Sequence, residues 1–267
     1  WSSVTSPPAG FFDSGRVNDI WRSPDNDLLY VSGEFNAGFR VVSLDRAGTV
    51  GEVFKKGNTV DFSFTAGNYR RNAEGRQIAE SLTGVGIVYK EMDGGDPQES
   101  WETGYGFWQD QYPNGVQILD MDVHDGKFYA AGSTISQPPM VFLPGWETEF
   151  DFDILALVDS GGLSAYSGEM WGIDVNDDGV TLGGVNQSAG RGVVYSYSFA
   201  SDAPMNDRTS WTMVDLISLF PDNSTWIQGV CRGPSNLVYA VGRESREGWG
   251  IVVRSTDGGQ TFEDISP

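Results

Sequence analysis

Three aspartates, Asp19, Asp61 and Asp120, occupy the same place in three short segments that read apolar–x–Asp–apolar. Carboxylates that meet in one site can carry out glycoside hydrolysis, one as a proton donor with a raised pKa and the other as base or nucleophile. Carboxylates repeated at one position also accept hydrogen bonds from backbone N–H groups, and converging ones can hold a cation. All three roles stay open, and we favour the structural one.

A second acidic pattern, Asp174-x-Asn176-x-Asp178-Gly179, is typical of the start of a calcium loop. In such a loop, oxygen ligands at alternating positions converge on one ion, and a bidentate glutamate stands at the twelfth position. That position is Val185 here. We therefore interpret the segment as a polar hairpin turn and expect no cofactor, with Ca²⁺ as the alternative.

Two long stretches that interrupt the surrounding pattern are rich in aromatic residues, and a third carries arginines. Exposed aromatics beside acids and amides suit sugar stacking or a protein contact, in which Trp, Tyr and Arg are favoured anchors. Loops also tend to carry function. The alternative is that these rings are buried locally against a sheet. The predicted contact residues are Tyr105, Phe107, Trp108, Tyr112, Trp146, Arg70 and Arg71.

The composition excludes several classes of protein. The chain has 267 residues, with 17 Lys+Arg against 37 Asp+Glu, for a formal net charge of −20. Such a chain is repelled by nucleic-acid phosphates and by anionic lipid surfaces. No apolar run approaches the roughly 20 residues of a membrane span, and no signal peptide is visible. One cysteine and one histidine exclude an intrachain disulfide and a multi-histidine metal site.

The elements that must position these residues form a repeat. Five segments share one order: a short apolar strand with Asp or Gly at its centre, a polar turn, a strand that ends in glycine, a third strand and a short edge strand. The central residues stand at positions 19, 61, 120, 172 and 229, separated by 42, 59, 52 and 57 residues. In the second segment we expect residues 60–64 to form the first strand and the stretch around 68–72 to replace the turn. Short alternating strands bounded by Gly, Asn, Asp and Pro indicate antiparallel sheet.

Four strands in each unit of about 50 residues predict an all-β fold, a β-propeller of four-stranded antiparallel blades. We expect five blades, or six or seven if the chain is part of a longer protein. The predicted bounds within a single domain of residues 1–267 are 15–57, 58–104, 115–168, 169–216 and 225–267. Residues 1–5 are a candidate strand that closes the ring.

Residues 254–262 read Arg-Ser-Thr-Asp-Gly-Gly-Gln-Thr-Phe. The series Ser255, Asp257, Gly259, Thr261 and Phe262 resembles the Asp-box, a hairpin of sialidases and of many non-catalytic propellers. The resemblance implies a propeller fold in which the Asp carboxylate accepts backbone N–H groups of its own turn. It does not imply an activity, since the Asp-box lies at the blade periphery.

Together these patterns predict a non-catalytic binding or assembly module. The expected partner is a protein of a larger assembly or a glycan, with no nucleic-acid binding and no membrane insertion. The expected place is extracellular, at a cell surface or in a virion or appendage. The alternative is a glycoside hydrolase or lyase that uses Asp19, Asp61 and Asp120.

Overall fold

The computed structural model describes fifteen stretches of the chain: 16–23, 26–34, 39–55, 66–71, 73, 77–81, 86–90, 102–103, 116–134, 139–144, 152–156, 168–186, 190–221, 224–244 and 248–267. Contacts divide the chain into two compact units, residues 1–115 and residues 116–267. Each unit is described by itself.

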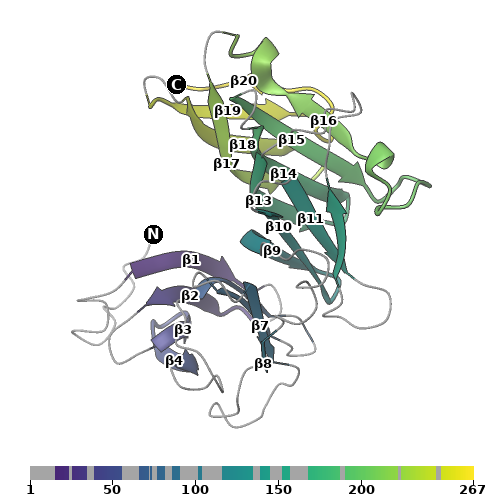
Figure 1. The fold of residues 1–267 in the computed structure, drawn as a ribbon. Helices are drawn as coiled ribbons and strands as arrows, with labels where there is room; N and C mark the ends of the chain where they lie inside the picture. Colours follow the sequence, from purple (N-terminus) through teal and green to yellow (C-terminus); the bar gives the residue numbers. More distant parts are fainter. Residues whose placement is uncertain are drawn as a thin grey trace. The chain divides into compact units, whose positions relative to one another are not determined.

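The first unit contains two four-stranded antiparallel sheets (Figure 1). In each sheet the strands pair in sequence order, as in a meander. We call each such sheet a blade and number the blades in chain order. Blade 1 consists of β1 (Arg16–Arg22), β2 (Leu29–Glu34), β3 (Phe39–Leu44) and β4 (Val50–Lys55). Blade 2 consists of β5 (Ala66–Arg71), β6 (Gln77–Ser81), β7 (Gly86–Lys90) and β8 (Glu102–Thr103).

The second unit contains three more blades with the same strand order. Blade 3 consists of β9 (Val116–His124), β10 (Lys127–Thr134), β11 (Pro139–Pro144) and β12 (Phe152–Ala156). Blade 4 consists of β13 (Gly168–Asn176), β14 (Gly179–Asn186), β15 (Arg191–Ser198) and β16 (Thr212–Asp215). Blade 5 consists of β17 (Thr225–Arg232), β18 (Val238–Glu244), β19 (Gly250–Ser255) and β20 (Glu263–Asp264).

Helical structure in the described residues is limited to two single 3-10 turns, η3 (Arg208–Ser210) and η4 (Leu216–Ser218). The predicted all-β architecture of four-stranded antiparallel sheets is therefore confirmed. Among these residues no helix has the length and apolar character needed to cross a membrane.

A β-bulge recurs at one place in the first strand of every blade. The bulge lies between Ile118 and Asp120 in β9 and between Met170 and Gly172 in β13. A bulge adds one residue to one strand and bends it. The residues that follow the five bulges are Asp19, Tyr69, Asp120, Gly172 and Gly229, separated by 50, 51, 52 and 57 residues. We call these the marker positions.

This register corrects the prediction for the second repeat. Its first strand is β5, and Tyr69 follows the bulge. The strand that pairs with β6 is therefore β5, and Tyr69 rather than Asp61 holds the marker position of this sheet. Residues 60–64, with Asp61, lie outside the described residues. The stretch expected to replace the turn forms the strand instead. Asp61 matches the apolar–x–Asp motif, but the even spacing of the bulges is the stronger signal for the position of the first strand.

The bulge also explains the glycine near the end of the second strand. Gly184 pairs with Met170 directly before the bulge, and Gly242 pairs with Ile227 at the same place in blade 5. A Cβ on Gly184 would lie 2.1 Å from the carbonyl oxygen of Glu169, and a Cβ on Gly242 would lie 1.9 Å from that of Trp226. Since no side chain fits such a space, the glycine and the bulge require each other.

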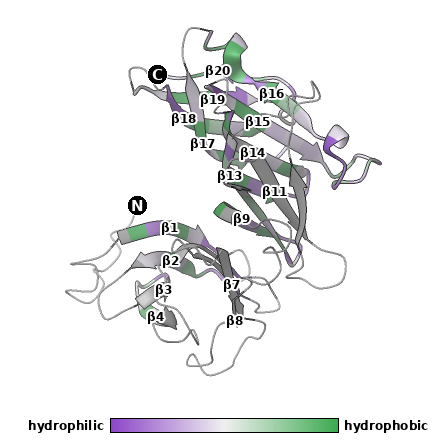
Figure 2. Cartoon of the chain, viewed as in Figure 1, coloured by the Kyte–Doolittle hydropathy of each residue, from purple (hydrophilic) through white to green (hydrophobic). Residues whose placement is uncertain are grey.

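The hydrophobic core of the second unit lies between consecutive blades. Tyr129 and Ala131 of blade 3 pack with Met170 and Ile173 of blade 4. Ile227 and Ala240 of blade 5 pack in turn against Val194 of blade 4 in a further cluster. Hydrophobic and hydrophilic residues are interleaved along the strands (Figure 2), which is the alternation expected when the two faces of a sheet differ in burial.

Candidate functional site

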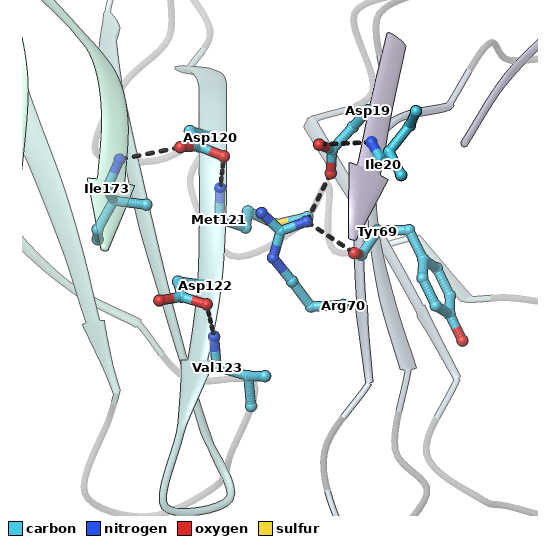
Figure 3. Close-up of polar contacts among 9 residues, drawn as sticks. All are labelled: Asp19, Ile20, Tyr69, Arg70, Asp120, Met121, Asp122, Val123 and Ile173. Atoms are coloured by element: carbon cyan, nitrogen blue, oxygen red, sulfur yellow. Dashed lines mark hydrogen bonds and ion pairs between the residues drawn. The ribbon is translucent and has the colours of Figure 1, made fainter. Parts of the chain in front are cut away.

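The carboxylate of Asp120 joins blade 3 to blade 4. Its Oδ1 accepts the backbone N–H of Met121 at 2.9 Å, and its Oδ2 accepts that of Ile173 on β13 at 2.9 Å. Two residues further along β9, Asp122 accepts the N–H of Val123 at 2.8 Å and that of Val175 at 2.8 Å. Figure 3 shows Asp120 between Met121 and Ile173. Both carboxylates therefore use one oxygen within their own strand and the other across the blade junction.

Asp19 holds the corresponding place between blades 1 and 2, with a different partner. Its Oδ1 accepts the N–H of Ile20 at 2.8 Å, and its Oδ2 accepts a hydrogen bond from Arg70 Nη1 at 2.6 Å (Figure 3). The Arg70 side chain is 8% exposed and that of Asp19 is 21% exposed. Arg70 also donates to the carbonyl oxygen of Tyr69 at 2.8 Å and lies 5.6 Å from the ring of Trp21.

The catalytic alternative involves three carboxylates, of which the structure describes two, Asp19 and Asp120. Both oxygens of Asp19 and of Asp120 accept hydrogen bonds, one from the next residue of the same strand and one across the blade junction. Asp61 lies outside the described residues. A general acid or base must be able to reach the proton of its substrate. In the described part of the chain, the geometry of Asp19 and Asp120 therefore fits a structural role.

The calcium-loop candidates form a hairpin between β13 and β14. Asp174 Oδ2 accepts the backbone N–H of Arg232 on β17 at 2.5 Å. Asn176 Oδ1 accepts the N–H of Asp178 at 2.9 Å, which closes the turn. Within the stretches that the structure describes, no group of three or more His, Cys, Asp or Glu side chains could hold a metal ion. A polar turn with a link between blades 4 and 5 accounts for these contacts.

Of the predicted contact residues, only the two arginines lie in the described part of the chain. Arg70 is buried in the junction between blades 1 and 2. Arg71 Nη1 donates to the hydroxyl of Tyr30 at 3.2 Å, and Tyr30 packs on Tyr69 with ring centroids 4.9 Å apart. Both arginines therefore contact aromatic residues that pack within the first unit. The predicted aromatic contact residues lie outside the described residues: Tyr105, Phe107, Trp108, Tyr112 and Trp146.

Residues 255–262 form a turn closed by their own side chains. Asp257 Oδ1 accepts the N–H groups of Gln260 at 2.9 Å and Thr261 at 3.0 Å, together with the Ser255 hydroxyl at 2.7 Å. Burial raises the pKa of Asp257, but the hydrogen bonds from Ser255, Thr261 and Gln260 outweigh burial and lower the pKa to about 2. Gly259 has a φ of +90°, and Phe262 packs against the core between blades 4 and 5. The turn anchors the last strand of blade 5.

A cluster of large side chains that the sequence reading missed lies where β13 and β17 begin. The indoles of Trp171 and Trp226 meet edge to face, with centroids 5.2 Å apart and an interplanar angle of 72°. The guanidinium carbon of Arg243 lies 4.7 Å from the Trp226 ring, and Trp171 Nε1 donates to Glu169 Oε2 at 2.6 Å. We call these four residues the aromatic corner.

The sequence contains a weak signal for the aromatic corner. Both tryptophans stand in first strands, where apolar residues are expected to be core, and so neither was distinguished from packing. Trp171, however, occupies the residue directly before the marker, between Met170 and Gly172. The same place is Asn18 in β1 and Gln228 in β17, which are polar, and Leu119 in β9, which carries no ring. A large ring at a position that is polar in other repeats is the signal that could have identified it.

No protein-family model matches the chain, and no curated protein does. Solved structures do match. "YCF48 bound to D1 peptide" superposes with a TM-score of 0.54 at 13% identity, over 91% of this chain and 66% of that one. The GH74 xyloglucanase from Xanthomonas campestris gives 0.59 at 13% identity, over 90% of this chain and 36% of the enzyme.

A third match is the extracellular domain of a B. thetaiotaomicron protein assigned as a one component system. Its TM-score is 0.53 at 11% identity, over 94% of this chain and 28% of that one. The chain therefore spans less than two thirds of the length of each of these proteins. At such low identity the likeness concerns the fold alone. The repeated four-stranded sheets and these neighbours together show that the chain has a β-propeller fold.

Proposed function

We propose that this chain is a non-catalytic β-propeller of the Asp-box type that serves as a binding or assembly module. Its partner is a protein or a glycan, and its place is a secreted, cell-surface or virion structure. One observation carries the non-catalytic part: both carboxylate oxygens of Asp19 and of Asp120 accept hydrogen bonds, one within its own strand and one across the blade junction. The self-closed turn at residues 255–262 supports the Asp-box assignment.

The structural neighbours are compatible with binding and with hydrolysis. One is a propeller with a bound peptide, another is a xyloglucanase, and a third is an extracellular domain. The xyloglucanase is the observation that favours a second candidate, a glycoside hydrolase or lyase. That candidate needs Asp120 to exchange a proton with substrate, which conflicts with its two backbone hydrogen bonds.

Two matched variants separate these functions. Asp120→Asn and Asp122→Asn each remove a carboxylate that joins β9 to β13, but only Asp120 belongs to the catalytic alternative. We expect wild type and both variants to release no reducing ends from xyloglucan, arabinan or xylan. We also expect both variants to lower the melting temperature by similar amounts, since each weakens a charged acceptor of a backbone N–H at a cost of about 1 kcal/mol.

Turnover by the wild-type chain that is lost in Asp120→Asn and retained in Asp122→Asn would overturn the proposal. The contact residues are tested separately with Trp108→Ala and Trp146→Ala, measured on an array of neutral and acidic glycans. Each variant is expected to lose the binding that wild type shows while keeping its melting temperature.

A further inference from the structure

The aromatic corner differs from the other aromatic contacts of the second unit in its exposure and its charge. Trp211 and Tyr197 also pack together, with centroids 5.5 Å apart, but both are buried in the core of blade 4. Trp171 and Trp226 are only half-buried, and Arg243 is exposed. The part of each ring that stays exposed adds nothing to packing, because apolar area contributes to stability only when it is removed from water.

Resting on the binding function proposed above, we propose that the aromatic corner is a binding site for a neutral oligosaccharide. Its four residues come from two consecutive blades: Glu169 and Trp171 from β13, Trp226 from β17 and Arg243 from β18. The site therefore exists only when blades 4 and 5 are packed together.

The two rings offer the apolar part of such a site. An edge-to-face pair presents a ring face beside a ring edge, at an angle of 72° here. The face of an aromatic ring carries partial negative charge, which favours the weakly positive C–H groups on one side of a pyranose ring. Arg243 lies over Trp226 at 4.7 Å. The face of Trp171 is therefore the surface on which we place the sugar.

The two charged groups offer the polar part. Trp171 Nε1 donates to Glu169 Oε2 at 2.6 Å, which fixes the orientation of the indole. Among the described residues, Glu169 Oε1 has no hydrogen-bond partner and the Arg243 guanidinium has no carboxylate partner. Sugar hydroxyl groups both donate and accept hydrogen bonds. A carboxylate and a guanidinium on either side of an indole can therefore satisfy neighbouring hydroxyls.

Charge selects a neutral ligand. An acidic glycan would meet Glu169 within the site and the formal net charge of −20 of the whole chain. A stable protein–protein contact buries about 800 Å² on each partner, far more than two half-buried rings supply. A neutral glycan requires neither a compensating charge nor a large surface.

The test is isothermal titration calorimetry of the wild-type chain with four neutral oligosaccharides: cellohexaose, a xyloglucan heptasaccharide, xylohexaose and chitohexaose. Trp171→Ala and Arg243→Ala are each expected to weaken binding at least tenfold for the oligosaccharide that binds. The matched controls are Trp249→Ala and Arg208→Ala. Trp249 is 69% exposed and Arg208 is exposed, and neither belongs to the aromatic corner. Both controls should bind as wild type does.

Arg243→Ala keeps the result interpretable, because an exposed arginine can be removed without opening the core. Its melting temperature should equal that of wild type. If none of the four oligosaccharides binds, the proposal of a carbohydrate site is wrong. The proposed function as a protein-binding module is not contradicted by that result. If one binds but the corner variants bind normally and Trp108→Ala does not, the site is wrong and the proposed function stands. Binding of polygalacturonate in preference to all neutral glycans would also overturn the inference.

Discussion

The junction between blades 1 and 2 and the junction between blades 4 and 5 use the marker position in two different ways. In the first, Asp19 forms an ion pair with the buried side chain of Arg70. In the second, both markers are glycine, and a Cβ on Gly172 would lie 2.9 Å from the Cα of Gly229. One junction is joined by charged side chains, and the other by backbones in close approach.

The difference concerns the two residue types, Asp and Gly, that recur at the marker position. Between blades 3 and 4, the aspartate at the marker position spans the junction, since Asp120 accepts the N–H of Ile173. Between blades 4 and 5, where the backbones are in close approach, the marker is glycine. The carboxylate two residues further along the strand is present at both junctions: Asp122 accepts the N–H of Val175, and Asp174 accepts that of Arg232. Every described junction within the two units therefore has at least one carboxylate that spans it.

The largest expected effect concerns the close-packed glycines. Gly242→Ala should lower the free energy of unfolding by about 3 kcal/mol, since its Cβ would overlap the carbonyl oxygen of Trp226 and the backbone would have to shift. That corresponds to a fall in Tm of roughly 6–12 °C. The control is Gly250→Ala, also in blade 5, where the nearest atom to a Cβ is 4.0 Å away. Equal losses in both variants would contradict the steric account.

The next effect concerns the charged junction. Asp19→Asn should cost about 2 kcal/mol, because it leaves the buried guanidinium of Arg70 without its carboxylate. Asp120→Asn should cost about 1 kcal/mol, because its partners are neutral N–H groups. Chemical denaturation of both variants measures the difference. The comparison fails if Asp120→Asn proves the more costly substitution.

A smaller effect comes from Asp257 and depends on pH. Its folded-state pKa is about 2, below the ordinary value of 3.8. The ionised carboxylate therefore stabilises the fold at pH values above about 4, and this contribution is lost as the pH falls toward 2. Asp257→Asn should lower Tm at pH 7, and the gap to wild type should narrow at pH 2.5. A gap that is constant over this range would contradict the assignment.

Calcium is expected to have the smallest effect. Asp174 and Asn176 already accept hydrogen bonds from Arg232 and Asp178. A cation would have to displace these bonds. We expect 5 mM CaCl₂ and 5 mM EDTA to give the same Tm within about 1 °C, whereas a rise of several degrees with calcium would show a site that binds only the folded state.

The repeat was predictable because each of its signals has a local cause. In four of the five blades, a bulge in the first strand pairs with a glycine near the end of the second strand. The apolar–x–Asp or apolar–x–Gly pattern therefore marks the first strand, and the later glycine marks the second. Blade 2 departs from this pattern, since Glu80 stands near the place of the glycine and Tyr69 at the marker. Its first strand was misplaced for that reason.

The candidate site was harder to predict from the sequence. A carboxylate that bonds a backbone N–H about 53 residues away has the same sequence signature as one that faces substrate, and Asp120 fits both descriptions. The aromatic corner depends on a contact between Trp171 and Trp226, which lie in different blades. Single-sequence periodicity assigns each residue to a strand face, but it does not tell which neighbour lies across a junction.

The meander order of every sheet has a consequence for how the protein is made. Each strand pairs with the strand that follows it in the chain, so that backbone pairing within a blade needs no distant segment. Short loop closures of this kind are rapid, and domains emerge from the ribosome N-terminal part first. A blade can thus pair its strands during synthesis, whereas the carboxylate links between blades form only once the following blade has emerged. Substitutions such as Asp120→Asn should accordingly accelerate unfolding more than they slow folding.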